Sequence, residues 1–240
     1  MAASKFAQNE QKLSGWKSWG LVILVLILGS ILTFKVLEPV KVLPRIDLSP
    51  GFIFRDQFGE KKTNEYYRGK ITVINFAFTN CKESCAATYE KMSALQTALQ
   101  ASTSSYIQTM LITISLDPQR DQAEQLIAAS EAYSLPKTVI YWDFLSGDVI
   151  LTRYVVEGGF GLPYFNPAEN GNEGVDYQIE FEPRFFLVDG WGIIRAEYNT
   201  DEFEVEQVMS DINLLNQEYQ YSDGPGRMAY EAAHLFGCYP

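Results

Sequence analysis

Two cysteines four residues apart, Cys81 and Cys85, are the side chains of this chain best suited to chemistry. They stand in FTNCKESCAATYEKM, where an apolar run gives way to helical spacing. The free N–H groups and the dipole at a helix N-terminus favour thiolate, which is both a nucleophile and a metal ligand. Residues on such a turn also fall within the Cα separation that a disulfide tolerates. The pair can therefore be a redox pair or a Cu(I) site. The alternative is two buried small apolar side chains.

The amino-acid composition argues against several other classes of function. The chain has 240 residues and a formal net charge of -11. So acidic a chain lacks the basic surface that supplies most nucleic-acid affinity, and we expect no nucleic-acid partner. One histidine and three cysteines cannot build a multi-histidine zinc centre or a disulfide framework. The chemistry is therefore expected to use sulfur or carboxylate.

The elements that must position the cysteines follow an alternating order. Apolar, β-branched runs predict buried strands, and helical spacing between them predicts crossover helices of a layered sheet. The predicted strands are 71–79, 107–116 and 138–144; the predicted helices are 85–100, 120–133 and 202–219; hairpins are predicted over 52–63 and 184–198, and a last short helix over 228–236. Cys81 then falls at the end of a central strand and Cys85 in the first turn of the following helix.

The first forty residues predict a membrane anchor. From Ser18 to Phe34 the chain is apolar and uncharged, and no A-x-A cleavage pattern follows, which favours an uncleaved span over a secretory signal peptide. We expect a tail over 1–17, a transmembrane helix over 18–37 and an extended, proline-containing tether over 38–51. The strongly acidic domain favours a single-pass protein of the cell or inner membrane, with the domain on the periplasmic or extracytoplasmic side.

Four stretches carry a family resemblance, in the order FIFRDQFGEKKT, YRGKITVINFAFTNCKESC, LITISLDPQRDQAEQL and RFFLVDGWGIIRAEY. Together they resemble the SCO/SenC family, membrane-anchored thioredoxin-like proteins that deliver copper to cytochrome oxidases. The similarity spans about 52–219 and leaves 220–240 as a C-terminal extension. It implies an α/β fold, a thioredoxin-like sheet with flanking helices, and a copper-binding role for Cys81 and Cys85.

The chain departs from the family pattern at its metal ligands. Lys82 and Ala86 stand where the family usually has prolines. The family's third copper ligand is a histidine shortly before the strand that corresponds to FFLVD. An alignment without gaps places Phe181 there, and a phenyl ring cannot bind copper as imidazole does. We therefore expect copper binding to be weakened.

The C-terminal sequence EAAHLFGC offers substitute ligands. His234 and Cys238 are four residues apart and could fold back to join the cysteine pair. The alternatives are a histidine that only favours the end of a helix and a thiol that is inert or pairs with a partner.

The segment Gly158–Glu182 is predicted to be a long loop, which in compact domains is usually functional or disordered. Its acidic residues are read as a solvated face or as a docking patch for a basic partner. Its aromatic residues are predicted to be exposed and to form a contact surface, and they are Phe160, Tyr164 and Phe165. In the motif SLDPQRD, Asp117 and Asp121 are interpreted as turn and helix-capping residues.

Three functions fit these observations. The first is a copper-handling protein that assembles a cytochrome oxidase or a related electron-transport complex. The second is a degenerate SCO-like subunit of a respiratory or photosynthetic membrane complex. The third is a thiol-disulfide oxidoreductase that uses Cys81 and Cys85, which would make the protein an enzyme. In each case the partner is a membrane electron-transport complex, a cytochrome oxidase subunit or a protein docked on one.

Overall fold

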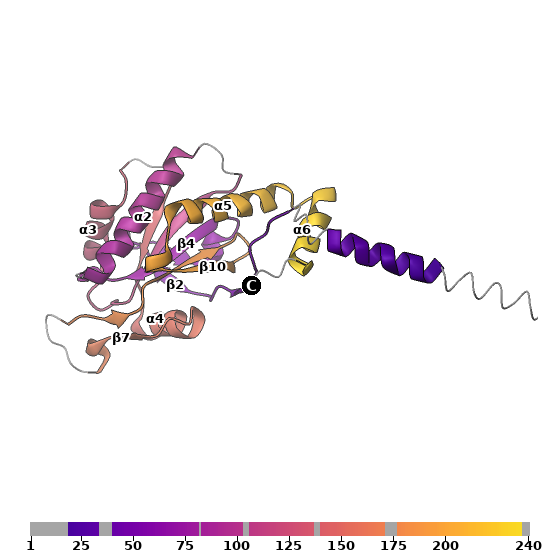
Figure 1. Cartoon of the computed structure of the whole chain (residues 1–240). Coiled ribbons are helices and arrows are strands. Elements are labelled where there is room, and N and C mark those ends of the chain that lie inside the picture. The colour runs from indigo at the N-terminus through magenta and orange to yellow at the C-terminus, as the bar shows by residue number, and fades with distance from the viewer. Residues whose placement is uncertain are drawn as a thin grey trace, which may run out of the picture. The chain divides into compact units, whose positions relative to one another are not determined.

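A computed structural model describes residues 19–33, 40–81, 83–102, 106–136, 140–170 and 177–236. The chain divides into two compact units (Figure 1). One unit is Leu43–Gly224, which contains the sheet and the cysteine pair. The other comprises residues 1–42 and 225–240, and its described elements are a helix over residues 19–33 and α6 (Pro225–Phe236).

The larger unit is built on a six-stranded mixed sheet in the order β1-β10-β9-β4-β5-β6. The strands are β1 (Asp47–Leu48), β4 (Ile71–Ala77), β5 (Thr109–Ser115), β6 (Trp142–Leu145), β9 (Arg184–Val188) and β10 (Ile193–Asn199). β4, β5 and β6 are parallel, whereas β9 runs antiparallel to β4 and β10 antiparallel to β9. All residues of β4 and β5 are buried, as expected for central strands covered on both faces.

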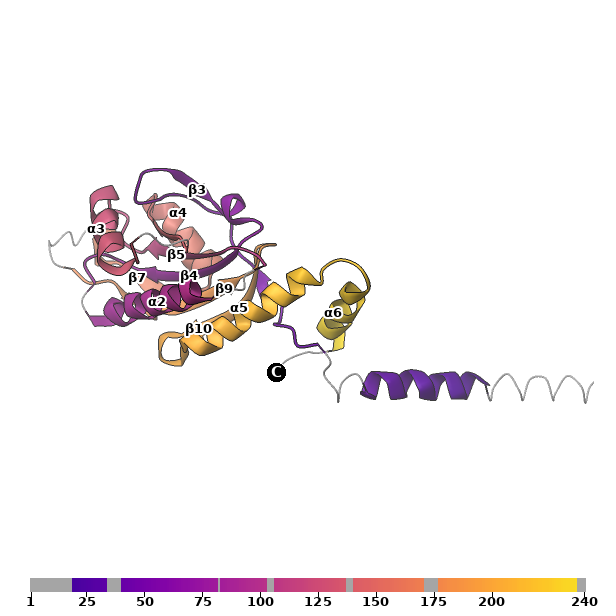
Figure 2. The same cartoon turned by 90° about the horizontal axis from the view of Figure 1, so that it is seen from above.

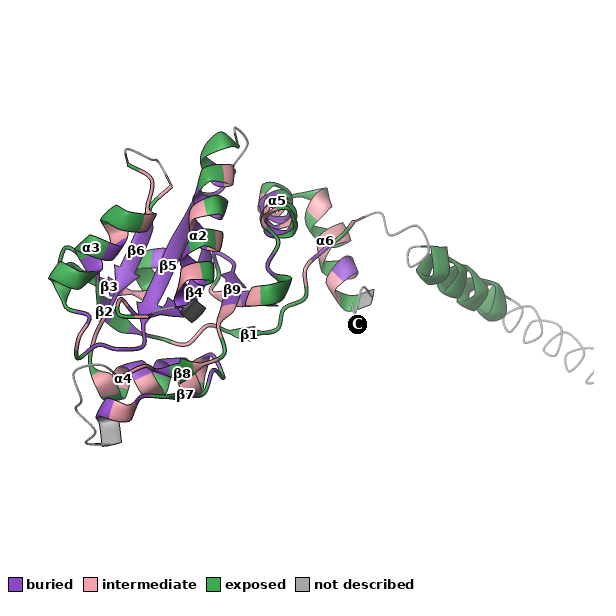
Figure 3. Cartoon of the chain, turned by 60° about the vertical axis from the view of Figure 1, so that its left-hand side comes forward, coloured by how far each residue is buried: buried purple, intermediate pink, exposed green. Residues whose placement is uncertain are grey.

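Helices cover both faces of the sheet (Figure 3). α2 (Glu83–Ala101) and α5 (Val205–Gln220) lie on one face, and α3 (Ala123–Tyr133) lies beside α2 and β6. The other face carries α4 (Val149–Arg153) and the π-helix η2 (Tyr154–Gly159). Short elements complete the unit: β2 (Ile53–Arg55), β3 (Lys61–Thr63), η1 (Asn64–Tyr67), β7 (Tyr164–Phe165), η3 (Pro167–Asn170), β8 (Glu180–Phe181) and η4 (Thr200–Glu202). The predicted α/β, thioredoxin-like arrangement of strands and crossover helices is confirmed.

The predicted anchor is described only in part. Residues 19–33 are helical, whereas Ser18 and residues 34–37 lie outside the described residues. Within the described part of the chain, no helix is both long enough and apolar enough to cross a membrane. The larger unit begins at Leu43, and β1 pairs with β10 at Ile193 and Ile194. Most of the predicted tether 38–51 therefore lies within the folded unit.

The prediction of a long loop over Gly158–Glu182 is wrong in part. The segment contains the end of η2, the ribbon of β7 with β8, and η3, while residues 171–176 lie outside the described residues. Two of its aromatic residues belong to the core: Phe160 is 5% exposed and Tyr164 is 6% exposed. The Phe160 ring packs against Phe76 of β4 and Phe186 of β9. Only Phe165, which is 49% exposed, has the predicted surface position.

Candidate functional site

Cys81 and Cys85 form a disulfide where β4 gives way to α2. Their Cα atoms are 5.6 Å apart, within the usual range for a disulfide. The amide of Cys81 donates to the carbonyl of Phe78, which closes the turn after β4. Cys85 lies in the first turn of α2. The cysteine pair therefore lies at the carboxyl edge of the parallel strands, on the turn that follows the buried strand β4.

The two sulfur-bearing residues differ in exposure. Cys85 is 0% exposed, whereas Cys81 is only partly buried against the core. The exposed residue of a cysteine pair is the one that an external thiol or a partner protein reaches first. The geometry therefore assigns external contact to Cys81.

A buried carboxylate lies beneath the cysteine-bearing turn. Asp121, which is 1% exposed, accepts hydrogen bonds from the amide of Thr79 at 3.0 Å and from the Ser115 hydroxyl at 2.5 Å. The Thr79 hydroxyl also donates to it. Burial raises the pKa of Asp121, and the hydrogen bonds from Ser115 and Thr79 oppose that rise. The helix-cap interpretation is wrong for Asp121, because the N-cap of α3 is Gln122. Asp121 instead ties the ends of β4 and β5 together.

The segment before β8 covers the same turn. The Gln178 side-chain amide donates to the carbonyl of Asn80 at 3.0 Å, directly before Cys81. The ring of Phe181 packs edge-on against the ring of Phe78, with their centroids 6.3 Å apart. Sequence reasoning selected Phe181 through the resemblance and did not select Gln178, because no local pattern marks a contact made across 98 residues.

Three side chains fix the start of this covering segment. The Tyr177 hydroxyl donates to Asp117 at 2.8 Å, and Arg120 forms an ion pair with the same carboxylate. The Arg120 guanidinium lies 3.6 Å from the centroid of the Tyr177 ring and donates to the Tyr177 carbonyl. Burial and the hydrogen bond to Asp117 raise the pKa of Tyr177 to about 12. The phenol therefore stays protonated at neutral pH and can act as a donor.

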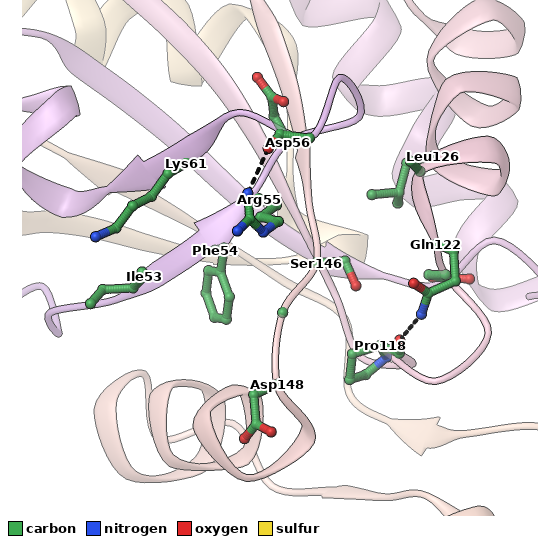
Figure 4. Close-up of a pocket in the computed structure, with 14 residues that line it drawn as sticks. Ile53, Phe54, Arg55, Asp56, Lys61, Pro118, Gln122, Leu126, Ser146 and Asp148 are labelled. Atoms are coloured by element: carbon green, nitrogen blue, oxygen red, sulfur yellow. Dashed lines mark hydrogen bonds between the residues drawn. The ribbon is translucent and has the colours of Figure 1, made fainter.

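A hollow of about 530 Å³ adjoins the turn through Asp121. Its walls are the β2–β3 hairpin, the loop from Pro118 into α3, and residues 146–148 (Figure 4). Gln122 donates to the carbonyl of Pro118 at this wall, and both side chains are shown in Figure 4. The lining contains basic Arg55 and Lys61 and acidic Asp56, Asp121 and Asp148. The hollow therefore carries charged groups of both signs.

The described structure does not test the other two predicted ligands, His234 and Cys238. His234 lies in α6, in the other compact unit, and Cys238 lies outside the described residues. Across the described ranges, no three His, Cys, Asp or Glu side chains are grouped so that they could hold a metal ion. The ligand roles of His234 and Cys238 stay predictions.

Comparison with known proteins agrees with this geometry. The family model SCO1/SenC matches residues 42–217. The chain belongs to the SCO1/SenC family. An SCO1 protein homolog of Bacillus subtilis is 30% identical over 162 residues, which cover 67% of this chain and 79% of the homolog. A putative copper-binding protein of Stutzerimonas stutzeri is 29% identical over 162 residues, which cover 65% of this chain and 72% of that protein.

Solved structures of SCO1/SenC proteins share the fold. A family lipoprotein from Bacillus anthracis superposes with a TM-score of 0.62 at 24% identity, covering 73% of this chain and 98% of that chain. BsSco, described as a member of the Sco family of cytochrome c oxidase assembly proteins with a disulfide switch, has a TM-score of 0.61 at 25% identity, covering 74% of this chain and 98% of its own. ScoI of Bradyrhizobium japonicum, solved with copper bound, has a TM-score of 0.57 at 20% identity, covering 70% of this chain and 99% of that chain. The resemblance to the family is confirmed.

Proposed function

We propose that this protein is a membrane-tethered SCO-type protein that handles copper for the assembly of a cytochrome oxidase or a related electron-transport complex. The observation that carries the proposal is the cysteine pair at the end of β4 in a chain of this family. When reduced, Cys81 and Cys85 offer two soft thiolates, which suit Cu(I). The copper ion is the cargo of the protein and not a resident cofactor.

The proposed tether is supported by the helix of residues 19–33. Its side chains are apolar on every face and exposed, for example Trp19 at 71%, Leu26 at 66% and Leu32 at 66%. A helix that is apolar all round requires an apolar environment. We propose that this helix belongs to a single membrane span, with the cysteine domain on the extracytoplasmic side, facing a membrane electron-transport complex or cytochrome oxidase subunit.

Copper titration of the reduced protein tests the proposal. Wild type should bind one Cu(I) per chain in competition with a chromophoric chelator, and Cys81→Ser and Cys85→Ser should each lose that binding. Ser222→Cys, which adds a thiol away from the pair, is the matched control and should leave the stoichiometry of tight binding unchanged. Tight binding that survives Cys81→Ser would reject the cysteine site.

A second candidate function is thiol-disulfide exchange. The observation that favours it is the formed disulfide with one partly exposed and one buried cysteine. Phe181, at the position where the family resemblance implies a histidine, packs against Phe78 and offers no metal ligand. An external thiolate that attacks Cys81 forms a mixed disulfide there and releases Cys85 as the leaving thiolate.

Trapping the mixed disulfide tests this second function. Both variants carry Cys238→Ser, so that each keeps a single thiol. Cys85→Ser should accumulate a mixed disulfide at Cys81 when incubated with oxidised glutathione, because no second thiol can displace the adduct. Cys81→Ser should react much more slowly, because Cys85 is 0% exposed. Equal rates of adduct formation in the two variants would reject Cys81 as the attacked residue.

A further inference from the structure

The β2–β3 hairpin places two cations opposite each other. Arg55 of β2 is the register partner of Lys61 of β3, and both residues are exposed. Like charges directly opposite each other on an antiparallel pair repel, so this pairing lowers the stability of the hairpin. Among the described residues, neither cation forms an ion pair, and the Arg55 guanidinium donates to the backbone carbonyl of Gly59 at 2.9 Å.

The adjacent lysine shows how the same hairpin treats a cation that it buries. The ammonium of Lys62 lies 3.2 Å from a carboxylate oxygen of Asp56 and 3.1 Å from one of Glu60. Lys62 is buried because successive side chains of a strand point to opposite sides. The fold therefore neutralises Lys62 and leaves the like-charge pair on the solvent side. Proteins break such local rules mainly at functional sites.

Both exposed cations line the hollow of about 530 Å³ next to the cysteine-bearing turn. Figure 2 shows β3 on the same side of the larger unit as α3 and α4, away from α5. Ile53, which is 54% exposed, lines the hollow on the hairpin side, and Leu126 of α3 lines it across from the hairpin (Figure 4). The hollow therefore offers two positive charges beside apolar surface.

The three carboxylates that line the hollow are engaged by donors of the fold itself. Asp56 pairs with Lys62. Asp121 accepts from residues at the ends of β4 and β5, and Asp148 accepts from two amides at the start of α4. No carboxylate of the fold is engaged in the same way with the two exposed cations, as far as the described residues extend. The charge left for a ligand is therefore positive.

We propose that this hollow is a docking site for an acidic segment of a partner protein. Carboxylates of the segment pair with Arg55 and Lys61, and its apolar side chains contact Ile53 and Leu126. A free inorganic anion uses only the two cations, whereas a peptide uses both kinds of surface. Asp121 of the hollow also bonds to Thr79, two residues before Cys81, so the docked segment adjoins the cysteine-bearing turn.

The net charge of the chain does not prevent this docking. The formal charge of -11 repels an acidic partner at long range. At physiological ionic strength, charges separated by more than about 8 Å are largely screened, so the ion pairs formed inside the hollow decide the affinity. No cysteine takes part, and the docking site is therefore independent of the proposed copper chemistry.

Peptide binding to the full chain in neutral detergent, with the disulfide intact, tests the inference. The probe is a rhodamine-labelled hexapeptide of alternating Glu and Val, and its matched control has Gln in place of Glu. Fluorescence anisotropy at about 0.15 M salt measures both affinities. Wild type should bind the Glu peptide about tenfold more tightly than the Gln peptide, and Lys61→Glu should abolish this preference. Arg68→Gln removes an exposed cation that does not line the hollow and should keep the preference.

The stability of the same variants separates docking from a structural role. Lys61→Glu replaces the like-charge pair by an opposite-charge pair, so its urea midpoint should equal or exceed that of wild type. A lower midpoint, or a preference for the Glu peptide that survives Lys61→Glu, would overturn the inference. Equal affinity of wild type for the two peptides would also overturn it, and displacement of both by inorganic phosphate would then identify a site for small anions.

Discussion

The ring of Phe181 packs edge-on against Phe78, with the ring centroids 6.3 Å apart, and Phe78 lies three residues before Cys81. The side chain at position 181 is thus held at the cysteine-bearing turn. Because an imidazole there would add a nitrogen donor to two thiolates, Phe181→His should tighten Cu(I) binding by about tenfold or more. Competition with a chelator measures this change in the reduced protein.

Phe181→Leu is the matched control for that substitution. It removes the ring without adding a donor, and we expect its Cu(I) affinity to equal that of wild type. If Phe181→His also left the affinity unchanged, either position 181 would not face the thiolates or another third ligand would already be bound.

Arg195 should be the most sensitive charged residue of the fold. Arg195→Met leaves the buried carboxylates of Asp189 and Glu218 without their buried counter-charge, which costs about 3–5 kcal/mol of unfolding free energy. The control Arg45→Met removes a partner of Glu218 that is 41% exposed, and should cost below about 1 kcal/mol. Urea unfolding measures both. Similar losses in the two variants would contradict the role given to Arg195.

The strands and helices around the cysteines could be predicted from the sequence because their signals are local. β4 is a continuous apolar run, and α2 repeats buried residues at helical spacing, as Tyr89, Met92 and Leu95 show. The position of the cysteine pair could be predicted from the same two elements, because it lies where one ends and the other begins. These features need no knowledge of what packs against them.

The features that the sequence predicted wrongly, or did not reveal, depend on contacts between residues far apart in the sequence. Phe160 was expected on the surface because it stands among glycines, yet it fills the space under Phe76 and Phe186. Asp121 has the sequence position of a helix cap, but its oxygens bond to Thr79, 42 residues earlier. Arg195 lies in a strand with no local sign that it binds a carbonyl 152 residues away. Such contacts are set by the topology and have no local sequence pattern.

Phe160 and Phe165 should respond differently to truncation. Phe160→Ala removes a buried ring from the face of the sheet and should cost about 3–5 kcal/mol of unfolding free energy. Phe165→Ala changes a side chain that is 49% exposed and should stay within about 0.5 kcal/mol. Thermal and urea unfolding report both values. A small loss for Phe160→Ala would mean that the η2 segment is not part of the core.

Asp121 gives the stability of this fold a defined pH dependence. Burial raises its pKa above the ordinary value of 3.8, although hydrogen bonds from Ser115 and Thr79 oppose the rise. The folded protein therefore holds this proton more tightly than the unfolded chain does. The resulting contribution to stability is complete below pH 3.8 and is lost as the pH rises through the folded pKa.

Asp121→Asn removes this titration while keeping an oxygen that can accept from the Thr79 amide. The unfolding free energy of wild type minus that of the variant should therefore fall as the pH is raised from about 4 to about 7. Urea unfolding of both proteins at several pH values measures this difference, and groups common to both cancel. A difference that rises with pH would show that the buried carboxylate is instead stabilised in its charged form by Thr79 and Ser115.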